Sequence, residues 1–334
     1  MKRLRAAVIG LGIGEQHILG YQQHPQCEVV ALCDQSNEKR SEVALRYPTI
    51  TMTSRAEDVL DNPEIDVVSI ATYDDSHYEY VIRALERGKH VFVEKPLCLY
   101  AQQARHIREI LREHPQLQLS SNLILRKSPR FQQLKKMANE GVFGDFFFVE
   151  GDYNYGRIHK IIQGWRGMSD FYSVVYGGGV HIVDLLMWLT GERIVEVSAY
   201  ANQIASKGST FRYPDMVVSL LKFENGLIGK MAVNFGCVYP HFHPLTLYGT
   251  SATFVNRLEE GLLYRSRELA AIPEKMTTAY PCVQKGALLP PFIDSIVGAA
   301  PPEVSADDVF RAMSVCFAIQ KSQETGSSVV VDYI

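Results

Sequence analysis

The chain has 334 residues, 46% of them hydrophobic, and a formal net charge of −3. This length and composition are enough to bury a sizeable core and predict two domains. The small negative charge argues against nucleic acid or an anionic membrane as a partner. The six cysteines include no Cys-x-x-Cys pair, and the N-terminal apolar run is only one strand long. We therefore expect a cytoplasmic protein without a metal site, disulfides or a membrane span.

The first motif is a glycine-rich turn between a predicted strand at 4–9 and a predicted helix at 15–24. Its residues are Gly10, Gly12, Ile13 and Gly14. Strand, turn and helix in this order are typical of a dinucleotide-binding fingerprint, in which a pyrophosphate binds the free N–H groups at the helix start. Glu15 replaces the usual third glycine, and glycine turns before helices are common, so this motif by itself is weak.

An acidic residue follows the second predicted strand, at 28–33. Asp34 stands about 20 residues beyond the glycine turn, where a carboxylate accepts hydrogen bonds from ribose hydroxyls of a dinucleotide. A carboxylate there also repels a 2′-phosphate, which favours NAD over NADP. Asp34 can at the same time cap the next helix, and the nearby Lys39 and Arg40 leave NADP as the alternative.

The first 121 residues continue as alternating strands and helices. Strands are predicted at 66–71, 90–93 and 117–119, and helices at 76–87 and 101–114. This alternation indicates a parallel, doubly wound sheet with right-handed crossovers.

Two further turns are expected at the sheet edge that holds the glycine turn. After the strand at 90–93, Glu94 and Lys95 precede Pro96, and proline cannot continue an interior strand because it lacks an N–H group. The turn after the strand at 66–71 contains Ala71, Thr72 and His77. Ligands of open α/β sheets bind at the carboxyl ends of strands, so these turns predict a nicotinamide site beside Lys95. A solvated surface turn is the alternative for Lys95.

Together with a segment in the second half, these residues resemble the Gfo/Idh/MocA oxidoreductase family, which includes glucose–fructose oxidoreductase and inositol 2-dehydrogenase. The segments that carry the resemblance are Gly10-Leu-Gly12 with His17, Asp34, Ala71 to His77, Gly88 to Pro96, and Gly177 to Gly191. The resemblance implies an N-terminal Rossmann domain and a C-terminal α/β domain with a large open sheet, which often serves as an oligomer interface. It also implies that Lys95 lies beside the nicotinamide and that Lys95 and His181 face the carbon that exchanges hydride.

From residue 122 the pattern changes to β-rich runs that follow one another without helices between most of them. These runs predict a largely antiparallel sheet with strands at 145–155, 195–201, 216–223, 227–235, 245–248 and 253–255. Asn225-Gly226 between two of the runs is a strong hairpin signal. Helices are predicted at 128–140, 291–299 and 307–325.

A helix that follows three glycines carries His181, the predicted general acid or base. Asp184 lies three residues further and shares a helix face with it. A helix histidine is more often a core residue, but the family position favours catalysis here. Many members of the family carry aspartate where this chain has Gly177. Tyr176, Asp184 or Asp170 are therefore the candidates for the missing role.

The irregular stretch at 156–179 is the candidate substrate loop, because long loops in compact domains are usually functional or disordered. Its aromatic and arginine side chains suit a sugar, and arginine also pairs with carboxylate or phosphate. Packing against the sheet edge is the alternative. The predicted substrate-binding residues are Lys95, Asn122, Arg157, Trp165, Arg166, Tyr176 and His181. We expect His241 and His243 to contact substrate or to be structural rather than to bind zinc.

We therefore predict an NAD(P)-dependent oxidoreductase that transfers hydride between nicotinamide and a secondary alcohol or ketone of a sugar, sugar derivative or cyclitol. An NAD-retaining sugar lyase or glycosidase of the same fold and a non-catalytic NAD(P)-binding sensor are the alternatives. The two domains are predicted at 1–121 and 122–334, with a homodimer or homotetramer forming through the C-terminal sheet. Lys95, Tyr176, His181 and Asp184 are the catalytic candidates. The predicted cofactor-binding residues are Gly10, Gly12, Ile13, Gly14, Asp34, Ala71, Thr72, His77, Glu94 and Lys95.

Overall fold

The computed structural model describes residues 3–281 and 283–334, which divide into two compact units. The first unit contains the described residues up to Ile124, the segment 283–310 and Ile334. The second unit contains the described residues of 125–282 and the segment 311–333. Cys282, one of the six cysteines of the sequence, lies outside the described residues.

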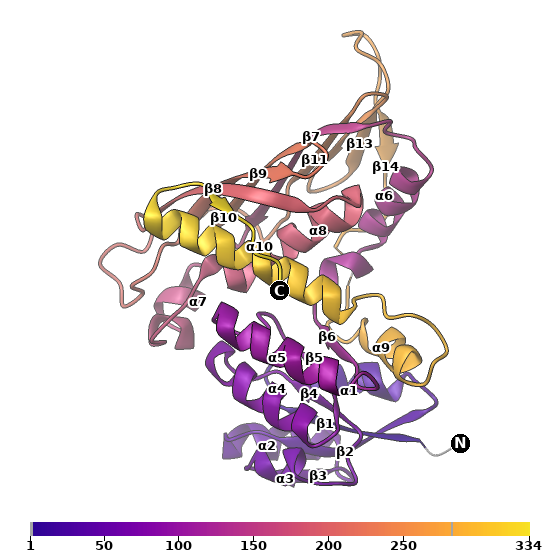
Figure 1. The fold of residues 1–334 in the computed structure, drawn as a ribbon, viewed down its shortest axis with the longest axis vertical. Helices are drawn as coiled ribbons and strands as arrows, with labels where there is room; N and C mark the ends of the chain where they lie inside the picture. Colours follow the sequence, from indigo (N-terminus) through magenta and orange to yellow (C-terminus); the bar gives the residue numbers. More distant parts are fainter. Residues whose placement is uncertain (1–2, 282) are drawn as a thin grey trace. The chain divides into compact units, whose positions relative to one another are not determined.

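The sequence placed residues 122–124, the segment 283–310 and Ile334 in the second domain, and the structure places them in the first unit. The segment 283–310 is the largest of these differences. Apolar packing explains the difference. Helix α9 (Leu289–Ile296) packs on helix α1 (Glu15–Gln22), and the rings of Phe92 and Phe292 have centroids 5.6 Å apart. Figure 1 shows α9, coloured as a late part of the chain, beside the purple elements of this unit.

The first unit is built on a parallel sheet of six strands in the order β3-β2-β1-β4-β5-β6. This order confirms the predicted doubly wound fold, with the strand order reversing between β1 and β4, where such sheets bind ligands. The short strand β3 was not predicted, because none of its three residues is buried and it lacks the apolar run of the other strands. The strands are β1 (Leu4–Ile9), β2 (Cys27–Cys33), β3 (Thr51–Thr53), β4 (Val67–Ile70), β5 (His90–Val93) and β6 (Leu119–Ser121).

Helices of the first unit pack against its sheet and each other. Helix α4 packs on α5, and both have strongly amphipathic sequences whose apolar positions are buried. The remaining bounds are α2 (Asn37–Arg46), α3 (Glu57–Leu60), α4 (His77–Glu86) and α5 (Ala101–Glu113).

The second unit contains a mixed sheet of nine strands in the order β14-β13-β12-β11-β7-β10-β9-β8-β15. All its pairs are antiparallel except β7 with β10, so the predicted antiparallel character is confirmed. The strands β13, β14 and β15 were not predicted, because each is short. The strands are β7 (Phe146–Asn154), β8 (Ile194–Asn202), β9 (Met216–Phe223), β10 (Ile228–Asn234), β11 (Leu245–Gly249), β12 (Thr253–Asn256), β13 (Gly261–Tyr264), β14 (Glu274–Met276) and β15 (Val329–Val330).

Helix α8 (Val180–Thr190) packs on β7 and on α6 (Pro129–Asn139), and nearly all of its residues are buried. Helix α10 (Ala306–Thr325) begins in the first unit and continues in the second, where the Ser322 hydroxyl accepts a hydrogen bond from the backbone of β8. The stretch at 156–179 is more regular than predicted. It contains α7 (His159–Ile162), a 3₁₀ turn (Trp165–Gly167) and a π-helical turn (Val175–Gly179).

Candidate functional site

The glycine turn of the first unit is tight on its inner side and open on its outer side. Gly10 has a φ of +87°, and a Cβ on it would lie 2.4 Å from the carbonyl oxygen of Ala71. A Cβ on Gly14 would lie 2.1 Å from the carbonyl oxygen of Gly10, whereas a Cβ on Gly12 would meet nothing within 4 Å. The turn therefore leaves an open cradle at the start of α1. The backbone at Gly12 is open to an approaching pyrophosphate at the start of α1, so these residues fit a dinucleotide.

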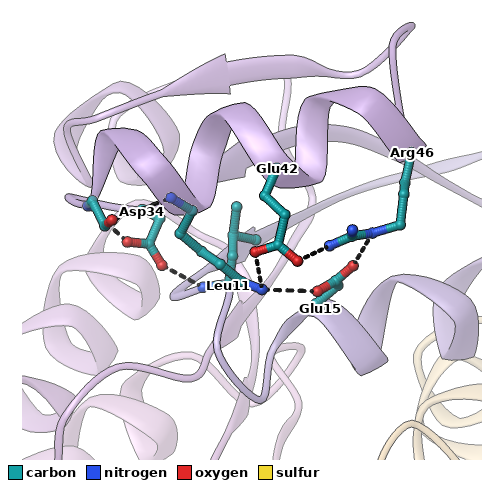
Figure 2. Close-up of polar contacts among 7 residues, drawn as sticks. Leu11, Glu15, Asp34, Glu42 and Arg46 are labelled. Carbon is teal, nitrogen blue, oxygen red and sulfur yellow. Dashed lines mark hydrogen bonds and ion pairs between the residues drawn. The ribbon is translucent and has the colours of Figure 1, made fainter.

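Asp34 is held at this turn by two backbone N–H groups. Its Oδ2 accepts a hydrogen bond from Leu11 at 2.7 Å, and its Oδ1 accepts one from Ser36 at 2.8 Å (Figure 2). Ser36 caps α2 by accepting from the backbone of Lys39, so Asp34 is not the cap. A carboxylate can accept about four hydrogen bonds, which leaves Asp34 with capacity for ribose hydroxyls. The Arg40 guanidinium donates to the backbone carbonyl of Asp34 at 2.7 Å and not to its carboxylate.

The other cations next to the turn are bound in an ion-pair network, drawn in Figure 2. Glu15 lies 3.1 Å from Lys39 Nζ and 2.6 Å from Arg46 Nε. Glu42 lies 3.2 Å from the same lysine and 3.0 Å from the same arginine. Partial burial by itself raises the pKa of Glu15, but the hydrogen bonds from Arg46 and Lys39 lower that pKa overall. The residue that replaces the third glycine of the fingerprint thus holds two basic side chains.

His77 joins the two other turns that the sequence placed at this edge. Its ring is buried, with Nδ1 2.6 Å from the carbonyl oxygen of Pro96 and Nε2 3.2 Å from that of Thr72. The turn after β4 and the turn after β5 therefore lie together, as expected. This arrangement gives His77 a structural function, and its predicted contact with the cofactor stays a prediction.

Glu94 anchors the turn that presents Lys95. Its carboxylate accepts a hydrogen bond from the amide of Asn122 at 2.6 Å and lies 3.4 Å from Nε2 of His17, whose Nδ1 is 3.2 Å from the Ser69 hydroxyl. Burial by itself raises the pKa of Glu94, but the hydrogen bond and charge of His17, with Lys95 and Asn122, lower it overall. Glu94 is therefore a carboxylate that fixes the backbone at Lys95.

Two members of this network carry roles that the sequence did not assign. His17 was named from the sequence only as one of the residues that carry the family resemblance. No pattern in the neighbouring sequence shows that its ring reaches Glu94. Asn122, predicted to bind substrate, donates to Glu94 and to the backbone carbonyl of Lys285 at 3.0 Å. Its predicted contact with substrate stays a prediction.

In the second unit, His181 lies in a cluster of aromatic rings. The ring is buried and stacks on Tyr153 with centroids 6.0 Å apart and an interplanar angle of 13°. Tyr153 in turn contacts Phe235, His241 and His243, with centroid distances of 5.9, 5.2 and 5.0 Å. We call these five residues the aromatic cluster. The segment His241-Phe242-His243 therefore contacts Tyr153, the same ring on which His181 stacks.

The two histidines of that segment have partners within the unit. His241 Nδ1 lies 3.2 Å from the carbonyl oxygen of Asn154, and His243 Nδ1 contacts the Tyr280 hydroxyl. Among residues 3–281 and 283–334, no group of three or more His, Cys, Asp or Glu side chains is arranged to hold a metal ion.

Asp184 forms a buried ion pair with Arg126. The Asp184 side chain is 2% exposed and that of Arg126 is 7% exposed, and Arg126 Nη2 lies 2.5 Å from Oδ1. The Nε atom of Arg126 also donates to both carboxylate oxygens, at 3.0 and 3.2 Å. Removing one partner of such a pair is strongly destabilising, because the other charge is left buried. Asp184 therefore has a structural partner, which weakens the case for it as the acid that assists His181.

The remaining predicted residues lie around the loop at 156–179. Tyr176 is buried, and its ring packs against Phe171 and Phe317 with centroids 5.9 and 5.5 Å away. The Arg157 guanidinium lies 5.6 Å from the ring centre of Tyr155. The Arg166 guanidinium lies 4.7 Å from that of Trp165. The structure leaves the substrate contacts of these residues untested.

The parallel sheet, the open glycine turn and the carboxylate at the end of β2 define a dinucleotide-binding oxidoreductase fold. Residues 4–122 match the model of an oxidoreductase family with an NAD-binding Rossmann fold, and residues 131–255 match the GFO/IDH/MocA C-terminal domain. The chain belongs to the Gfo/Idh/MocA family and is an NAD-dependent oxidoreductase, as the sequence predicted.

Characterised proteins of this family are similar over almost the whole chain. Inositol 2-dehydrogenase 3 of Saccharopolyspora erythraea is 25% identical, with 98% of this chain and 95% of the relative covered. Inositol 2-dehydrogenase of Salmonella typhimurium is 25% identical, with 98% and 97% covered. Among solved structures, levoglucosan dehydrogenase in complex with NADH superposes with a TM-score of 0.87, at 22% identity and with all of both chains covered.

Proposed function

We propose that this oxidoreductase interconverts a secondary alcohol and a ketone on a sugar, a sugar derivative or a cyclitol. The observation that carries the proposal is the stacking of His181 on Tyr153 within the aromatic cluster. Pockets for small ligands are typically lined by aromatic side chains with a few polar groups, and the cluster offers imidazole and phenol groups on such a surface. Inositol and levoglucosan, which the named relatives act on, are uncharged cyclic polyols.

In the oxidative direction the C–H and O–H bonds of the substrate carbinol break and a C=O bond forms. When bound, the nicotinamide supplies the acceptor for the hydride. We propose that His181 accepts the hydroxyl proton, because imidazole titrates near neutral pH and can both take and return a proton. We propose that the Lys95 ammonium stabilises the negative charge that develops on the substrate oxygen.

The proposal is tested by incubating the protein with NAD and each of myo-inositol, scyllo-inositol, levoglucosan and glucose. Formation of NADH with at least one of them is the expected result. Release of a cleaved or dehydrated product without net NADH would instead support a lyase or glycosidase. Binding of NADH without turnover of any compound in a broad polyol panel would support a sensor.

The cofactor pocket predicts a preference for NADH over NADPH. Asp34 repels a 2′-phosphate, and Lys39 and Arg46 are already paired with acidic residues. A charge pair near a protein surface is worth on the order of 1–4 kcal/mol, so Asp34→Asn should reduce the discrimination by about tenfold or more. Fluorescence titration of both reduced cofactors measures the ratio.

The matched variants for this prediction are Glu15→Gln and Glu42→Gln. Glu15→Gln removes an ion-pair partner from both Lys39 and Arg46, so it should also strengthen NADPH binding. Glu42→Gln leaves both cations paired with Glu15. Tighter binding of NADPH than NADH by the unmodified protein would show that Lys39 or Arg40 governs the pocket and that the prediction is wrong.

We also propose a homodimer or homotetramer that forms through the nine-stranded sheet. Strand registers place four exposed apolar side chains on one face of this sheet, and these are Tyr200, Val218, Leu220 and Ile228. Exposed apolar side chains gathered on one sheet face commonly mark an interaction site, and here they stand beside Lys222 and Lys230 of the same face.

Light scattering should therefore give a mass of two or four chains, and Leu220→Asp should shift it towards one chain. Leu45→Asp, at an exposed position on α2, is the control that should leave the mass unchanged. A monomeric unmodified protein would contradict the proposal.

A further inference from the structure

A tyrosine occupies the space next to Gly177, where the resemblance to the family implies an aspartate. A Cβ on Gly177 would lie 2.1 Å from the hydroxyl oxygen of Tyr172 and 2.9 Å from its Cζ. The tyrosine hydroxyl therefore fills the volume in which any side chain of residue 177 would begin. The sequence offered Tyr176, Asp184 and Asp170 for this role and missed Tyr172.

The position that this hydroxyl fills belongs to a residue four positions before His181. The π-helical turn at 175–179 runs directly into α8, so Gly177 and His181 are close to one turn apart. Side chains four residues apart on a helix have Cβ atoms about 5–6 Å from each other. Ring contacts also connect Tyr172 with the aromatic cluster, because its centroid lies 6.4 Å from that of Phe235.

Arg166 orients the hydroxyl. Its Nε donates a hydrogen bond to the Tyr172 oxygen at 3.0 Å, and its guanidinium lies 5.6 Å from the centre of the same ring. The oxygen therefore accepts one hydrogen bond from a cation, and a hydroxyl oxygen has a second lone pair to which an imidazolium N–H can donate. Tyr172 is buried and Arg166 is half-buried, so the tyrosine oxygen is largely shielded from water and its hydrogen bond is stronger than it would be in solution. Tyr153 stacks on His181, and the titratable rings of Tyr155, His241 and His243 contact Tyr153. Asp184, three residues after His181 on α8, is paired with Arg126.

We propose that Tyr172, oriented by Arg166, is a positioning residue for His181 and supplies the polar oxygen that an acidic residue at position 177 supplies in relatives. This inference rests on the proposed function, in which His181 carries the proton. It explains how a chain with Gly177 retains a polar group beside the imidazole. It also assigns the predicted substrate residue Arg166 a second task, which is to hold the tyrosine.

The test compares Tyr172→Phe with Tyr213→Phe. The Tyr213 hydroxyl binds the backbone carbonyl of Ser169 in the same loop, so its loss controls for loop anchoring. With the best polyol of the panel, Tyr172→Phe should lower kcat by about 10–100-fold, the effect of losing a hydrogen bond to a charged group, with little change in KM. Tyr213→Phe should stay within about twofold of the unmodified protein. Equal kcat values for the two variants would overturn the inference.

A second comparison tests whether a carboxylate at position 177 can replace the Tyr172 hydroxyl. Gly177→Asp alone should lose activity because its Cβ collides with the Tyr172 hydroxyl, and Tyr172→Ala alone should be slow. The double variant Tyr172→Ala with Gly177→Asp should regain activity over Tyr172→Ala by about tenfold or more, since the carboxylate occupies the vacated volume and pairs with Arg166. A double variant that is no faster than Tyr172→Ala would show that Tyr172 serves only packing.

A titration that needs no substrate separates this inference from the proposed function. The titration midpoint of the labelled His181 ring, followed by NMR, should fall by about half a pH unit or more in Tyr172→Phe, because the imidazolium loses an oxygen acceptor. It should rise in the double variant, which carries a carboxylate instead. An unchanged midpoint in both would overturn the inference even if the polyol assays succeed. If no polyol is oxidised, the proposed function fails and the midpoint still decides the role of Tyr172.

Discussion

Replacement of His181 by asparagine is expected to lower kcat by about 10²–10⁴-fold, the usual contribution of a positioned general acid or base. Asparagine approximates the shape of the ring, so the stacking position against Tyr153 can still be filled. NADH affinity should be unchanged, because the glycine turn and Asp34 belong to the other unit. The pH–rate limb near neutrality, where imidazole titrates, should vanish in the variant.

The control for this variant is His106→Asn, at an exposed position on α5 that hydrogen-bonds Tyr78. It removes one imidazole without touching the aromatic cluster and should retain the full rate and pH profile. Circular dichroism should report the same folded state for both variants. Full activity of His181→Asn would mean that our assignment of the chemistry in the second unit is wrong.

Replacement of Lys95 by methionine is expected to lower kcat by about 10²–10³-fold, which is typical when one donor aimed at developing charge is removed. Methionine keeps most of the apolar stem but not the ammonium. The turn itself should persist, because its carboxylate Glu94 remains bound to His17 and Asn122. Steady-state kinetics and a fluorescence titration with NADH measure the two effects separately, and we expect NADH binding close to that of the unmodified protein.

Lys95→Arg is the matched variant, because it keeps the charge and changes only its shape and position. We expect it to recover part of the rate that methionine loses, since guanidinium and ammonium groups are not interchangeable at a site with fixed geometry. If Lys95→Met turns over at a near-normal rate, Lys95 is a solvated residue of a surface turn after all.

Much of the first unit could be predicted because its signals are local. The strand at β1, the glycine turn after it and the acidic residue after β2 each depend on residues adjacent in sequence. Alternation of strands with helices then leaves few possible topologies, since crossovers are right-handed. The parallel order and the common edge of the three turns were therefore accessible without coordinates, and the structure confirms both.

The parts that were missed depend on contacts between residues far apart in the chain. The segment 283–310 returns to the first unit because Phe292 buries its ring against Phe92, and no local pattern records this pairing. Similarly, the sequence could predict that His181 and Asp184 share one helix, and both lie on α8. It could not reveal that Arg126 already neutralises the carboxylate.

The sequence by itself determined the class of fold, the cofactor-binding motif and Lys95 as a candidate, because backbone periodicity and turn chemistry depend on residues adjacent in the chain. His181 became a candidate through the resemblance to the family. Only the tertiary structure decided which side chains stand beside them. His17 and Asn122 hold the carboxylate of Glu94 in position, and the Tyr172 hydroxyl fills the space at Gly177. Such partners are selected by burial, since a polar group removed from water must find a hydrogen bond wherever the packed chain offers one.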